Sequence, residues 1–117
     1  MKCEICVDVD DVERAVRFYG EGVGLEVVKK ASDWAQLRVG EQTIWIMKIP
    51  SGYSGAISRQ YSRHWTPVHL DFHVDDIEAA IRRAVAAGGK LEGRPKASLA
   101  NFSDPSGNGV DLVQTSK

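Results

Sequence analysis

The same strand-to-helix pattern occurs twice in this chain, and this repeat is the strongest constraint on its fold. The segment from Val9 to Val16 aligns with the segment from Val74 to Ile81, a shift of 65 residues. Two copies form no extended array, so a solenoid is excluded. We expect two equivalent modules within one domain spanning residues 1–117, because this length suits a single compact unit.

The second copy shows how each module is expected to begin. Apolar residues alternate with His69, Asp71 and His73, and the apolar period then changes from two to about 3.6. One of the two following aspartates can cap the helix, and Gly88-Gly89 can end it. The apolar residues assigned to the inner face are Val68, Leu70, Phe72, Val74, Ile77, Ala80, Ile81, Ala84 and Val85. The polar face opposite indicates a wet or ligand-binding surface.

The first copy carries its own polar strand face. The shift makes Glu4 equivalent to His69, and it makes Cys6 and Asp8 equivalent to the two polar residues that follow His69. We therefore expect these residues on equivalent faces of equivalent strands.

A βαβββ order is predicted for each half of the chain. The predicted elements are a strand over 2–9, a helix from Asp10 or Asp11 to about Gly20, strands over 25–30, 34–39 and 42–49, the second strand and helix described above, and strands near 90–94, 97–103 and 109–115. Asp104-Pro105-Ser106-Gly107 predicts a tight turn. Module one then covers about 1–49, a long connection covers 50–66, and module two covers about 67–117.

Charge and composition limit the possible partners. The net charge of −1, without a basic run, argues against nucleic acid. No apolar stretch approaches the ~20 residues of a membrane span, and no signal peptide is expected. Cys3 and Cys6 are expected on opposite strand faces, which disfavours a disulfide, and the Cys-x-x-Cys spacing lacks the helical context of redox motifs. We expect a cytoplasmic protein.

Three segments resemble the vicinal oxygen chelate superfamily, which includes glyoxalase I, bleomycin-resistance proteins, fosfomycin-resistance enzymes and extradiol dioxygenases. They are VDVDDVERAVRFYGEGVGLEVV, HLDFHVDDIEAAIRRAVAAGG and FSDPSGNGVDLVQ. The resemblance implies an α+β fold in which two βαβββ modules form a curved mixed sheet around a cleft, with the helices outside. It also implies a divalent metal in the cleft and a homodimer.

The resemblance further implies which residues hold the metal. The four ligand positions of the superfamily fall on Glu4, Trp45, His69 and Asp111. Because tryptophan cannot ligate a metal, Glu4, His69 and Asp111 remain. One imidazole and two carboxylates suit Ni, Zn, Mn, Co or Fe, with open positions for substrate. Asp111 is shorter than the glutamate usual at its position, and either Glu4 or Asp111 could instead serve as a catalytic base.

Further residues are predicted to contact a small-molecule ligand. Those assigned to the ligand-lining face are Trp34, Arg38, Trp45, Asp71 and His73, with Gln36 on the same face. Aromatic and basic residues also gather in the connection, namely Tyr53, Arg59, Tyr61, Arg63, His64 and Trp65. Connecting segments of this kind often carry substrate or dimer contacts, and the alternative is a disordered loop.

Three functions fit these patterns. The first is a metal-dependent lyase, isomerase or dioxygenase acting on a substrate with adjacent oxygens. The second is a metal-free protein that sequesters a cationic or aromatic small molecule, with acidic residues as counter-charges and Trp34 and Trp45 stacking on the ligand. The third is an interaction module whose cleft is vestigial.

Overall fold

Two βαβββ modules follow one another in the computed structural model, which describes residues 1–50, 60–64 and 66–116. Module one contains β1 (Ile5–Val9), α1 (Val12–Val16), η1 (Arg17–Val23), β2 (Glu26–Lys30), β3 (Trp34–Val39) and β4 (Gln42–Lys48). Module two contains β5 (Leu70–Val74), α2 (Ile77–Ala86), β6 (Lys90–Lys96), β7 (Leu99–Ser103) and β8 (Gly109–Gln114). The predicted α+β class and the repeated βαβββ order are confirmed.

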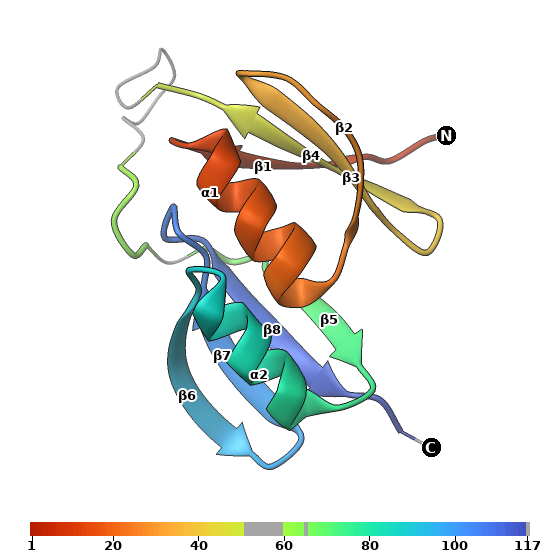
Figure 1. The fold of residues 1–117 in the computed structure, drawn as a ribbon, viewed down its shortest axis with the longest axis vertical. Helices are drawn as coiled ribbons and strands as arrows, with labels where there is room; N and C mark the ends of the chain where they lie inside the picture. Colours follow the sequence, from red (N-terminus) through yellow and green to blue (C-terminus); the bar gives the residue numbers. More distant parts are fainter. Residues whose placement is uncertain (51–59, 65, 117) are drawn as a thin grey trace.

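The strands form two separate four-stranded sheets with the same topology. Their orders are β1-β4-β3-β2 and β5-β8-β7-β6, and in each sheet the first strand pairs in parallel with the last strand of its module. The helices lie on one side of both sheets, and the modules meet where η1 packs on α2 (Figure 1). The predicted curved sheet is therefore present as two sheets, one in each module. β1 and β5 are edge strands of these sheets and are not paired with each other.

Aspartates begin both helices and glycines end both helical segments. The side chains of Asp11 and Asp76 accept hydrogen bonds from backbone N–H groups three residues ahead, at 3.0 and 3.1 Å. Gly24 and Gly88 adopt φ values of 106° and 101°, which the left-handed ends of these segments require. The first helix continues beyond the predicted end near Gly20, because η1 is π-helical as far as Val23.

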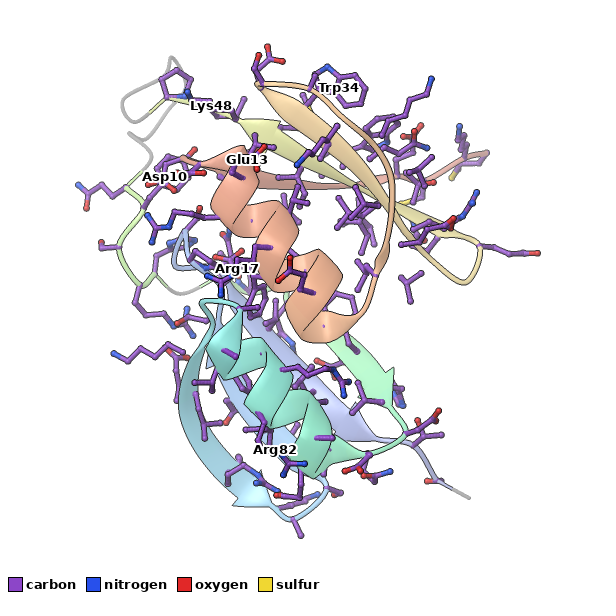
Figure 2. All side chains as sticks on the ribbon, viewed as in Figure 1. Asp10, Glu13, Arg17, Trp34, Lys48 and Arg82 are labelled. Carbon is purple, nitrogen blue, oxygen red and sulfur yellow. The ribbon has the colours of Figure 1, made fainter. Side chains whose placement is uncertain are left out.

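Small residues let the two modules approach closely. A methyl group at Gly22 would lie 3.0 Å from Ala87 Cβ and 3.1 Å from Ala84 Cα. Arg17 adds a hydrogen bond from its Nη2 to the carbonyl of Ala86 at 2.8 Å, at the position labelled in Figure 2. Because the buried face of α2 turns toward these contacts, Val85 is 49% exposed, so its assignment to the inner face is wrong.

The first strand of each module begins later than the sequence predicts. Val68 was expected to face the core, but it is 76% exposed because β5 begins only at Leu70. The first strand likewise begins at Ile5 rather than Lys2. His69 and Glu4 therefore stand directly before the first residue of their strands.

A buried polar network joins the modules at the predicted turn. Gly107 N donates to the Asp104 carbonyl at 3.0 Å, which closes the turn. Tyr19 of module one donates its hydroxyl to Asp104 Oδ2 at 2.6 Å, and both side chains are buried. Burial, followed by the negative charge of Asp104 and this hydrogen bond, raises the pKa of Tyr19 well above its usual range, so the hydroxyl remains a donor. Asp10 also accepts a hydrogen bond from Ser106 Oγ at 2.7 Å.

None of the helices within the described ranges is both long enough and apolar enough to cross a membrane. Cys3 and Cys6 are exposed free thiols.

Candidate functional site

Strand register gives Glu4 and His69 equivalent places in their modules. Ile5 pairs with Ile44 in sheet one, and Leu70 pairs with Val110 in sheet two. The next pairs are Cys6 with Trp45, and Asp71 with Asp111. Trp45 and Asp111 are therefore equivalent as well. Module one has an indole at this position, where module two has a carboxylate.

His69, Asp71 and Asp111 converge in module two. His69 Nδ1 lies 2.9 Å from Asp71 Oδ1 and 3.5 Å from Asp111 Oδ2. One potential ligand atom from each of the three residues lies within 4.8 Å of the others. An imidazole and two carboxylates at this spacing form a donor set that suits a divalent transition metal.

Asp111 is held in place from the neighbouring strand. Asn101 on β7 pairs with Asp111 on β8, and its Nδ2 donates to Asp111 Oδ1 at 2.8 Å. The other carboxylate oxygen faces His69. The Asp111 side chain is 17% exposed, whereas that of His69 is 51% exposed, so the cluster lies at the mouth of a depression rather than in the core. Such hydrogen bonds orient a carboxylate before an ion or ligand arrives.

A cavity of about 300 Å³ adjoins this cluster. Its walls come from module two and the end of the connection, and the lining residues are Arg63, Thr66, His69, Glu92, Asn101, Phe102, Gly109, Val110 and Asp111. Most of these residues are polar or charged, and Phe102 and Val110 are nearly fully buried, so the cavity offers a ligand mainly polar groups.

Glu4 lies outside the His69–Asp71–Asp111 group. Its carboxylate accepts a hydrogen bond from Trp45 Nε1 and lies 3.3 Å from Lys2 Nζ. The hydrogen bond from Trp45, followed by the hydrogen bond and the positive charge from Lys2, lowers the pKa of Glu4 below its usual value. Within one chain the modules meet through their helices, which leaves Glu4 on the sheet of module one, away from the cluster.

Module one carries an aromatic pair at the equivalent position. The rings of Trp34 and Trp45 lie 6.0 Å apart at 59°, and Trp34 occupies the outer part of this sheet in Figure 2. Arg38 is not directed at this pair, because its Nη2 forms an ion pair with Glu26 on β2 at 3.0 Å.

The predicted ligand-lining residues are therefore divided between two places. Asp71 joins the cluster of module two, and His73 is exposed on the same strand without belonging to the cluster. In the connection, Tyr61, Arg63 and His64 are described, whereas Tyr53, Arg59 and Trp65 lie outside the described residues.

Sequence reasoning did not assign Asn101 and Glu92 to the site. A signal for Asn101 was present, because it follows Gln36 by the repeat shift of 65 residues and Gln36 pairs with Trp45 as Asn101 pairs with Asp111. No comparable signal marked Glu92.

Comparisons with known proteins agree with this architecture. A family model described as a glyoxalase-like domain matches residues 4–113. No protein of curated function matches the chain significantly in sequence. A glyoxalase/bleomycin resistance protein from Albidiferax ferrireducens is similar at a TM-score of 0.71 and 23% identity, covering 99% of each chain.

Two further solved structures share the fold. The fosfomycin resistance protein FosX from Mesorhizobium loti has a TM-score of 0.74 at 14% identity, covering 99% of this chain and 92% of its own. A glyoxalase-related enzyme from Fulvimarina pelagi has a TM-score of 0.72 at 19% identity, covering 98% of this chain and 89% of its own. At these identities the likeness concerns the fold. Because the family model spans nearly the whole chain, the chain belongs to the glyoxalase-like family, within the vicinal oxygen chelate superfamily.

Proposed function

We propose that His69 and Asp111, assisted by Asp71, bind a divalent metal ion, and that the adjoining cavity takes a small molecule with adjacent oxygens. The convergence of one imidazole and two carboxylates within 4.8 Å carries this proposal. The expected open coordination positions would accept substrate oxygens. The reaction class that fits best is metal-dependent lyase, isomerase or dioxygenase chemistry.

Each residue of the cluster has a distinct role in this proposal. Asp71 Oδ1 lies 2.9 Å from His69 Nδ1, the ring nitrogen that also faces Asp111 Oδ2 at 3.5 Å, so an ion would lie among these three atoms. Asn101 fixes one oxygen of Asp111, and the other oxygen is directed toward His69. A bound divalent ion would supply Lewis acidity for the oxyanionic charge that develops on the substrate. Asp111 could instead act as the base, since its side chain is directed into the cavity region.

In the proposed assembly, Glu4 would reach this site from a second copy of the chain. The open face of sheet one carries Glu4 beside Trp45, and the open face of sheet two carries the His69 cluster. We propose a homodimer in which these faces meet, so that Glu4 of the partner subunit completes the ligand set or serves as the base. Its lowered pKa keeps Glu4 ionised, which both roles require. The exposed free thiols fit the proposed cytoplasmic location.

Metal binding should raise the melting temperature of the wild-type protein and not that of His69→Ala. An ion that binds only the folded state stabilises it by about 2.7 kcal/mol at a hundredfold excess over its dissociation constant. The measurement is thermal denaturation after chelator treatment, with Ni, Zn, Mn and Co added separately. His73→Ala is the matched control, because His73 lies on the same strand face outside the cluster. Equal shifts in wild type and His69→Ala would contradict the assignment.

The Trp34–Trp45 pair favours a second candidate function. Two indoles 6.0 Å apart beside the Glu4 carboxylate could hold a flat cation by stacking and charge. The same melting series, extended to benzyltrimethylammonium, separates the candidates. A shift for this compound with no shift for any metal would favour metal-free sequestration.

A further inference from the structure

Arg63 reaches the cavity from the connection, which is docked firmly onto module two at this point. His64 N donates to the Gly107 carbonyl at 3.3 Å, and His64 Nε2 lies 2.9 Å from Asn108 Oδ1. A methyl group at Gly107 would lie 2.2 Å from the Ser62 carbonyl oxygen, so the two backbones touch. Arg63 is therefore presented from a fixed backbone.

The guanidinium of Arg63 is positioned on two of its three nitrogens. Nε donates to Glu92 Oε2 at 2.6 Å, and Nη1 donates to the carbonyls of His64 and Gly107. Nη2 has no acceptor among the residues that the structure describes. A methyl group at Gly109 would lie 3.0 Å from Nη2, so the glycine leaves the space that the guanidinium occupies against the start of β8.

Arg63 also differs in charge from its surroundings. Among the described residues that line the cavity, it is the cation, while Glu92 and Asp111 are carboxylates. The ion pair with Glu92 uses Nε alone, and the Arg63 side chain remains 46% exposed. A planar guanidinium held this way, with Nη2 available, is suited to a carboxylate or phosphonate oxygen.

We propose that Arg63 binds an oxyanionic group of the ligand, so that the cavity takes a small organic anion whose other oxygens face His69 and Asp111. This inference rests on the proposed function, because it takes the same cavity as the ligand site. It narrows the substrate class to molecules that carry a carboxylate or phosphonate in addition to the oxygens directed at the cluster. Glu92 is a positioning residue, because it contacts Arg63 and holds its orientation.

The test is an NMR titration of the metal-free protein, residues 1–117, followed through the Nε–Hε resonance of Arg63. Succinate is the probe, and neutral succinamide is its isosteric control. Succinate should shift this resonance and succinamide should not. Arg63→Gln should weaken succinate binding at least about tenfold, whereas Arg63→Lys, which keeps the charge but loses the planar fork, should weaken it less. Repeating the titration with 3-phosphonopropionate tells whether a phosphonate or a carboxylate is preferred at Arg63.

Arg94→Gln is the matched control variant, because Arg94 also pairs with a carboxylate of module two, that of Glu78, but does not line the cavity. It should leave succinate affinity unchanged. Unchanged affinity in Arg63→Gln, with only a lowered melting temperature, would overturn the proposal and leave Arg63 a structural link to Glu92. The titration contains no metal, so it tests the anion site independently of the metal site. If succinate binds through Arg63 but no metal raises the melting temperature, only the metal proposal is contradicted.

Discussion

Replacing Phe72 with alanine should lower the free energy of unfolding by about 3–5 kcal/mol, the usual cost of removing a large core ring. Phe72 is 7% exposed on β5, and its ring centroid lies 6.2 Å from that of Tyr19. The substitution would therefore leave a void between the sheet of module two and the helix of module one. Chemical denaturation monitored by circular dichroism measures the change.

The neighbouring residue provides the control for this prediction. His73→Ala removes an exposed side chain one position along the same strand, so it should change stability by no more than about 0.5 kcal/mol. If His73→Ala unfolded the protein while Phe72→Ala left it stable, the two faces of β5 would be reversed.

Replacing Asp104 with alanine should cost about 3–5 kcal/mol, because one buried carboxylate satisfies several donors. Asp104 accepts from Tyr19 Oη at 2.6 Å, from the backbone N–H groups of Ser106 and Asn108 at 2.9 Å each, and from Asn108 Nδ2 at 3.0 Å. Alanine would leave the buried Tyr19 hydroxyl without this acceptor. It would also loosen the turn at residues 104–107, against which the connection packs. The measurement is again equilibrium denaturation.

Two companion variants divide the Asp104 effect into its parts. Asp104→Asn keeps an acceptor oxygen and should cost less than Asp104→Ala. Tyr19→Phe removes only the hydrogen bond that Asp104 accepts from module one and leaves the three donors from the turn satisfied. A cost below about 1 kcal/mol for Asp104→Ala would mean that the network contributes little to the junction between the modules.

The repeat predicted more of the fold than any local pattern did. Once Val9 and Val74 are aligned, the strand order of one module predicts that of the other, and register then makes Glu4 equivalent to His69. The packing of the modules is not encoded by this periodicity. It depends on the close approach of Gly22 to Ala84, which no apolar stripe reveals.

The candidate site was predictable only in part, because periodicity predicts pairing between strands but not contacts between side chains of distant segments. His69 directly precedes β5 and Asp111 lies within β8, and these two strands pair in register, so a repeat and an alternation are enough to bring the two residues together. Arg63 and Glu92 meet through a side-chain ion pair between the connection and β6, and neither period nor spacing predicts such a contact. Glu4 holds the position equivalent to His69, as the repeat predicts. It lies away from the His69–Asp71–Asp111 group because the modules meet through their helices.

The metal centre can be tested most directly by anomalous diffraction from crystals of the wild-type protein grown with Mn or Zn, recorded at the absorption edge of the metal. The account predicts an anomalous peak within bonding distance of both His69 and Asp111. If the proposed homodimer is present, Glu4 of the partner subunit should lie in or next to the coordination shell. A peak at His64 or His73 instead, or no peak at the His69–Asp71–Asp111 group under saturating metal, would contradict the central claim.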